Sequence, residues 1–142
     1  MEVSQVRKRV QGAIAAARTQ AQQRRQQTAD AEKAYETFLQ EVATPLARQV
    51  ANALKTEGYA FTLFTPAGTL RLAADRGRDD FIELALDAER EPPQVVGRIR
   101  HTRGSRTVDE ERPLRAGASP EDLTEEDVLE FFTGALEPWL AR

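Results

Sequence analysis

Cysteine is absent from this sequence, and His101 is its only histidine. The lack of cysteine excludes disulfides, thiolate nucleophiles and cysteine-based zinc or iron–sulfur sites, and a single histidine excludes a histidine-rich metal centre. There is also no glycine-rich loop of the kind that cradles phosphate, and no pattern singles out two of the 23 acids as a catalytic pair. The sequence therefore predicts no cofactor, no metal and no catalytic residue, and it favours a non-enzyme without excluding an enzyme.

Long apolar runs are missing as well. No stretch approaches the 18 consecutive apolar residues that a transmembrane helix needs, so none is predicted. Gln11, Arg18 and Gln20 interrupt the segment that follows the first basic residues, so we expect no secretory signal and a cytoplasmic location. The net charge of -3 argues against a protein that binds nucleic acid over its whole surface. The length of 142 residues suits a single domain with a real core.

Helix breakers are scarce in the first third of the chain. Between Glu2 and Thr44 there is no proline, and Gly12 is the only glycine, whereas Ala, Gln, Arg and Glu are abundant. All four are good helix formers, which predicts helix from residue 2 to residue 57. A helix of about 40 residues is roughly 60 Å long. Such a helix exceeds the expected width of the remaining chain, so it must fold back on itself or find a partner.

Thr44-Pro45 is the one possible joint in this helix, because Thr at an N-cap and Pro at the first helical position form a start signal. Either the helix kinks here or a second helix begins at Pro45. The apolar spacing favours a kinked continuation, since it crosses the proline unbroken through Val42, Leu46 and Val50.

An apolar stripe runs along the start of the helix and forms the candidate protein interface: Val3, Val6, Val10, Ile14 and Ala17. Residues 22–27 (QQRRQQ) interrupt the stripe, and residues 1–25 hold six basic side chains against one acid. We expect residues 1–30 to form an extended arm that pairs as a coiled coil, and residues 31–142 to form one domain. Packing within the chain, a free tail and a membrane-surface helix are the alternatives; the last lacks the Trp, Phe or Leu typical of such helices.

The apolar period changes from helical to alternating after Gly58. Strands are predicted at 59–64, 69–74, 82–87 and 94–103, with a turn over 75–79 and a short fifth strand around 106–108. Residues 109–123 are expected to be a loop, and a helix to begin at Thr124. The predicted fold is α+β: a long N-terminal helix, a four- to five-stranded antiparallel meander and a C-terminal helix packed on the sheet.

Four arginines on and just after the fourth predicted strand are candidates for contacting an anion or nucleic acid: Arg98, Arg100, Arg103 and Arg106. Arg98 and Arg100 project from the same face of a strand, so they form a basic stripe. No exposed aromatic accompanies them for base stacking. The competing interpretation is neutralisation by acids of a neighbouring strand, such as Glu83 and Asp87.

Taken together, these patterns favour a non-catalytic interaction, scaffold or chaperone-like protein. It would form a homo-oligomer, or bind a protein partner, through its N-terminal helix. One alternative is a nucleic-acid-associated protein that uses the basic helix and the arginine strand. A second is an enzyme of unidentified class with a pocket between sheet and helices.

Overall fold

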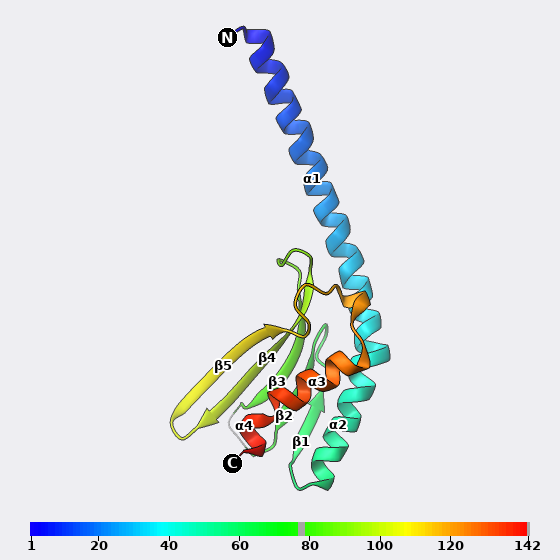
Figure 1. The fold of residues 1–142 in the computed structure, drawn as a ribbon, viewed down its shortest axis with the longest axis vertical. Helices are drawn as coiled ribbons and strands as arrows, with labels where there is room; N and C mark the ends of the chain where they lie inside the picture. Colours follow the sequence, from blue (N-terminus) through cyan, green and yellow to red (C-terminus); the bar gives the residue numbers. More distant parts are fainter. Residues whose placement is uncertain (77–78, 142) are drawn as a thin grey trace.

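The computed structural model describes residues 1–76 and 79–141. Its α+β architecture is the predicted one: a long N-terminal helix, a five-stranded antiparallel sheet and a C-terminal helical segment (Figure 1). The elements in chain order are α1 (Val3–Phe38), the π-helical turn η1 (Leu39–Ala43), α2 (Thr44–Thr56), β1 (Phe61–Phe64), β2 (Leu70–Ala74), β3 (Phe81–Asp87), β4 (Gln94–Arg103), β5 (Arg106–Pro113), the 3-10 turn η2 (Pro120–Asp122), α3 (Glu125–Ala135) and α4 (Glu137–Leu140).

Helix runs without a break from Val3 to Thr56, which confirms the preference for a continuation through Thr44-Pro45. The joint is a wide π-helical turn, in which the Thr44 N–H donates to the Leu39 carbonyl, five residues earlier. Proline lacks an N–H and its ring would clash with the carbonyl four residues before it in a regular helix. A wide turn directly before Pro45 accommodates the proline without ending the helix.

The five strands form an antiparallel meander in the order β1-β2-β3-β4-β5, as the short predicted connections require. One prediction was wrong: β5 extends to Pro113, so residues 109–113 belong to a strand and not to a loop. The acids of β5 have low strand propensity. They are held by pairing with β4 along all eight residues and by ion pairs across the ladder. The predicted turn over 75–79 includes Gly77 and Arg78, which lie outside the described residues.

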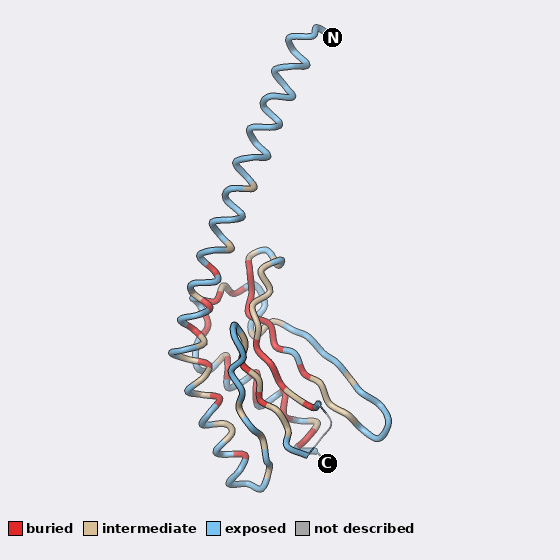
Figure 2. Tube along the Cα trace, turned by 180° about the vertical axis from the view of Figure 1, so that it is seen from behind, coloured by how far each residue is buried: buried red, intermediate tan, exposed pale blue. Residues whose placement is uncertain are grey.

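The core lies between one face of the sheet and the helices that cover it (Figure 2). Apolar side chains that alternate along the inner three strands supply the sheet side: Leu70, Leu72, Ile82, Leu84, Val95 and Ile99. Phe131, Phe132 and Trp139 supply the C-terminal side. The predicted helix start at Thr124 is confirmed by a capping box with Asp127. Helix α3 ends at Ala135, and α4 then carries Pro138 in its first turn.

Gly97 sets how closely α3 approaches the sheet. A β-carbon at this position would lie 2.0 Å from the Phe131 ring, closer than atoms can pack. The Phe131 ring therefore lies directly on the backbone of β4, with the Arg112 guanidinium 5.6 Å from its centre. Only glycine permits this contact, and the position of α3 depends on it.

We predict that Gly97→Ala lowers the free energy of unfolding by about 1–3 kcal/mol, because the new methyl group must displace the Phe131 ring within a packed core. Gly12→Ala is the matched control, since nothing lies within 4 Å of a β-carbon there. Urea unfolding followed by circular dichroism measures both variants. Equal stability of the two variants would contradict the close approach of α3 to β4.

Candidate interaction surfaces

The N-terminal part of α1 projects away from the domain as a single helix (Figures 1 and 2). Every residue from Met1 to Gln20 is exposed, and Ala31 is the first buried residue of the chain. The large members of the predicted interface stripe are between 45% and 83% exposed: Val3, Val6, Val10 and Ile14. Ala17 is exposed as well. We call residues 1–30 the arm; whether its stripe is an interface remains a prediction.

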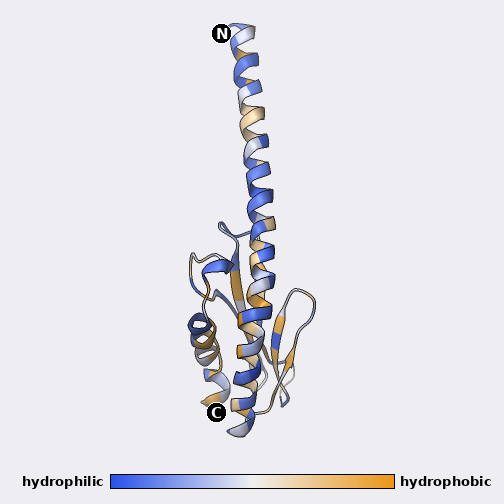
Figure 3. Cartoon of the chain, turned by 90° about the vertical axis from the view of Figure 1, so that its right-hand side faces the viewer, coloured by the Kyte–Doolittle hydropathy of each residue, from blue (hydrophilic) through white to orange (hydrophobic). Residues whose placement is uncertain are grey.

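The arm combines this apolar stripe with a strong positive charge. In Figure 3, which colours the backbone by hydropathy, the arm is mainly hydrophilic with hydrophobic residues at intervals. Among residues 1–25, six are basic and one is acidic. An isolated helix gains most of its stability from packing an apolar face, and this stripe faces no part of its own domain. The arm thus presents the features of a surface that another molecule covers.

A line of three hollows follows the other half of the long helix, between this helix and the C-terminal segment. The first, of about 200 Å³, extends from Gln27 to Ala34 and is closed by Pro120. The second, of about 320 Å³, extends from Ala34 to Val42 and shares the wall at Pro120. The third, of about 450 Å³, begins two turns further along α2. We call these three hollows together the groove.

The third hollow is the most apolar part of the groove. Its walls are α2, the segment between α2 and β1, and the C-terminal helices, and its apolar lining is Val50, Ala53, Leu54, Tyr59, Leu129, Leu136 and Leu140. Leu129 and Leu140 are about two-fifths exposed, which is unusual for leucines on short helices that pack on a core. Sequence reasoning missed this surface, because its walls are distant in sequence and periodicity reports only one helix at a time.

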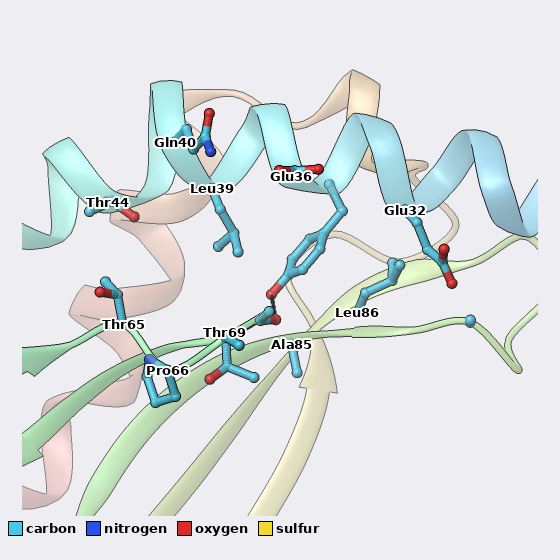
Figure 4. A pocket seen from close by; sticks show the side chains of 14 residues that line it. Glu32, Glu36, Leu39, Gln40, Thr44, Thr65, Pro66, Thr69, Ala85 and Leu86 are labelled. Atoms are coloured by element: carbon cyan, nitrogen blue, oxygen red, sulfur yellow. Dashed lines mark hydrogen bonds between the residues drawn. The ribbon is translucent and has the colours of Figure 1, made fainter.

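A separate pocket of about 610 Å³ lies on the opposite side of α1, above the β1–β2 turn (Figure 4). Tyr35 forms part of its lining and donates its hydroxyl proton to the Gly68 carbonyl at 2.8 Å. Burial, with a smaller effect of the Glu83 carboxylate, raises the pKa of the Tyr35 phenol well above its ordinary value. A phenol that keeps its proton and donates it to a carbonyl ties the helix to the turn and is a poor base at neutral pH.

The four candidate arginines lie on the β4–β5 hairpin but differ in their surroundings. Arg98 pairs with Glu111 at 3.4 Å, and Arg100 with Asp109 at 2.9 Å. The hydrogen bond to Asp109 and the charge of this carboxylate raise the pKa of the Arg100 guanidinium. The neutralising acids therefore come from β5, and not from Glu83 and Asp87 of β3.

At the tip of the same hairpin, Arg103 and Arg106 are exposed and lie opposite each other in the ladder. His101 is half-buried, and its ring packs edge-on against Trp139, 6.0 Å away. Within residues 1–76 and 79–141, no group of three or more His, Cys, Asp or Glu side chains is arranged to hold a metal ion. None of the helices in that part of the chain has the length and apolarity to cross a membrane.

We predict that Tyr35→Phe costs about 0.5–1.5 kcal/mol of unfolding free energy at neutral pH, because the Gly68 carbonyl loses its donor. The difference in unfolding free energy between the wild-type protein and this variant becomes smaller at alkaline pH. Above pH of about 10 an unfolded chain releases the tyrosine proton while the folded chain keeps it, so the wild-type protein loses stability as pH rises. The variant lacks this loss. Urea unfolding at pH 7.5 and at pH 11 measures the difference, and an unchanged gap between the two proteins would contradict a buried, hydrogen-bonded phenol.

Comparison of the chain with protein-family models, with curated proteins and with solved structures finds no match. The function must therefore be inferred from the surfaces themselves. Two of these surfaces, the arm and the groove, carry apolar residues that the described residues 1–76 and 79–141 leave exposed.

Proposed function

We propose that this chain is a non-catalytic assembly protein that associates with itself, or with a protein partner, through the arm. The observation that carries the proposal is the exposed stripe of Val3, Val6, Val10 and Ile14 on a helix that its own domain leaves uncovered. We also propose a cytoplasmic location, which suits a chain without cysteine.

The free energy available from covering the stripe is substantial. Full burial of one Val or Ile side chain contributes about 1.5–3 kcal/mol relative to full exposure. Four such residues follow one another along about three turns of helix, and in a symmetric dimer each copy contributes its own set. Helix propensity alone does not justify this spacing, because Ala, Gln and Glu would favour an isolated helix more than Val does.

The two alternative functions receive less support from the geometry. For nucleic acid, two of the four sheet arginines already pair with acids of β5. The Phe81 ring lies near Arg100, but the Arg71 guanidinium already stacks 4.1 Å from its centre, and the His101 ring packs against Trp139. For an enzyme, the pocket beside Tyr35 offers a phenol that is engaged with a carbonyl. Glu32 and Glu36 line the same pocket, but among the described residues no hydrogen bond joins their carboxylates to the threonine hydroxyls that line it with them.

We predict that the full-length chain is oligomeric and that Val6→Glu with Val10→Glu shifts it to monomer, since two charges would enter an apolar contact. Light scattering coupled to size exclusion measures the mass of each species. The double variant Gln5→Glu with Ala16→Glu is the matched control, because it changes the charge equally on the opposite face of the same exposed helix.

The control variant should keep the wild-type mass, and circular dichroism should show both variants to be folded. A wild-type chain that is monomeric at every concentration would overturn self-association. Loss of the oligomer in both variants would instead attribute it to charge and not to the stripe.

A further inference from the structure

We propose that the groove is the docking site for the arm of a second copy of this chain, so that two long helices lie antiparallel and each arm covers the other domain's groove. This inference rests on the proposed function and adds the partner, its direction and its site. It follows from three matches between arm and groove: in length, in apolar pattern and in charge.

The lengths agree. The arm part of α1, from Val3 to residue 30, is about 42 Å long, and the part from Ala31 to Thr56 that forms one wall of the groove is about 39 Å long. Two identical helices that cross near residue 30 in opposite directions therefore place each arm beside the first two hollows of the other copy, and the arm reaches the third hollow by following the bend between α1 and α2 (Figure 1). A twofold axis at this point makes the contact self-complementary, as a closed dimer requires.

The apolar patterns agree in the same register. Counted along the helices from an axis near residue 30, Val10 comes level with Val50, and Val6 with Leu54 of the other copy, and an arm that follows the bend at η1 brings these pairs into contact. Val50 and Leu54 line the third hollow, together with the exposed Leu129 and Leu140. The most apolar stretch of the arm thus meets the most apolar part of the groove.

The polar break in the arm (residues 22–27) meets a polar part of the groove. In this register it lies beside the first two hollows, whose linings include the polar residues Gln27, Asp30, Thr37, Glu41, Ser119 and Glu121. A break that would weaken a coiled coil of two arms therefore suits the groove.

The charges decide between this arrangement and a pairing of the two arms with each other. The charged residues that line the three hollows are all acids: Asp30, Glu41, Glu57 and Glu121. Two arms side by side would bring 12 basic residues together with two acids, because each copy contributes six and one within residues 1–25. Like charges at such spacing repel, whereas a basic arm in an acidic groove is attracted.

Cysteine cross-linking tests the direction and the site, and the absence of native cysteine makes it specific. The test variant carries Val10→Cys with Val50→Cys. These positions lie on one continuous helix, about 60 Å apart, and a disulfide needs α-carbons within about 7 Å, so a cross-link can form only between copies. Under mild oxidation the double variant should form covalent dimers at least tenfold faster than either single variant. A mixture of the two single variants should yield the mixed dimer, whereas Ala16→Cys with Val50→Cys, on the outer face of the arm, should not cross-link.

The outcomes separate the two proposals. A wild-type dimer in which Val10→Cys alone cross-links efficiently would overturn docking in the groove, because it places two arms side by side, and would leave self-association intact. A wild-type monomer would overturn both. As an independent readout, Glu41→Lys with Glu121→Lys should raise the dimer dissociation constant about tenfold at low salt. Glu36→Lys with Glu89→Lys makes the same charge change away from the groove and should leave the constant within about twofold; equal effects of the two pairs would contradict the charge match.

Discussion

An apolar helix face is stable in water only where something covers it, and this requirement shapes the whole molecule. The helix from Val3 to Thr56 carries apolar residues along its length, but the domain that it packs on covers only the part after Ala31. Within the domain the requirement is met by Tyr35, Phe38, Ala43 and the residues that follow. In the arm, none of the residues that the structure describes covers the apolar stripe. The apolar stripe of the arm therefore stays exposed to water, whereas the apolar face of the same helix after Ala31 is packed.

The continuity of the helix makes the arm a rigid feature and not a hinged tail. If Pro45 had begun a new helix after a loop, α1 could have folded back along α2 and covered its own stripe. The π-helical turn before Pro45 accommodates the proline, so that α1 and α2 form one continuous helix that bends at this turn (Figure 1). The Tyr35 hydroxyl then fixes the helix to the β1–β2 turn at 2.8 Å. The continuous helix and the Tyr35 hydrogen bond both hold the arm away from the groove of its own domain. The arm therefore cannot fold back into that groove.

The sequence was sufficient where structure is set by local pattern. The breaker-free start predicts the helix, the alternation after Gly58 predicts the meander, and Thr124 predicts the start of α3. It failed at β5, because Asp109 and Glu111 are poor strand residues that are stabilised by arginines of another strand.

The sequence also failed at the groove, and for a similar reason. The walls of the groove combine α2 with residues some 75 positions later in the chain, such as Leu129, and no spacing rule connects them. Periodicity identified the apolar stripe of the arm, which the structure leaves exposed, and the role of this stripe as an interface stays a prediction. Periodicity could not reveal the hollows that we propose as its docking site. The sequence predicted that acids of a neighbouring strand neutralise Arg98 and Arg100. It pointed to acids of β3, whereas the acids that pair with them belong to β5.

A symmetric exchange of arms would cover two exposed apolar surfaces with one contact. Left alone, each chain exposes the stripe of its arm together with the leucines at the rim of the third hollow. Either surface invites unspecific association, and a coiled coil of two arms would cover only the first of them while crowding their basic side chains. Because arm and groove are of similar length and opposite charge, the reciprocal docking that we propose would cover both surfaces with one contact. The exchange also closes after two copies, since each arm occupies a groove and no free arm or groove remains to recruit a third.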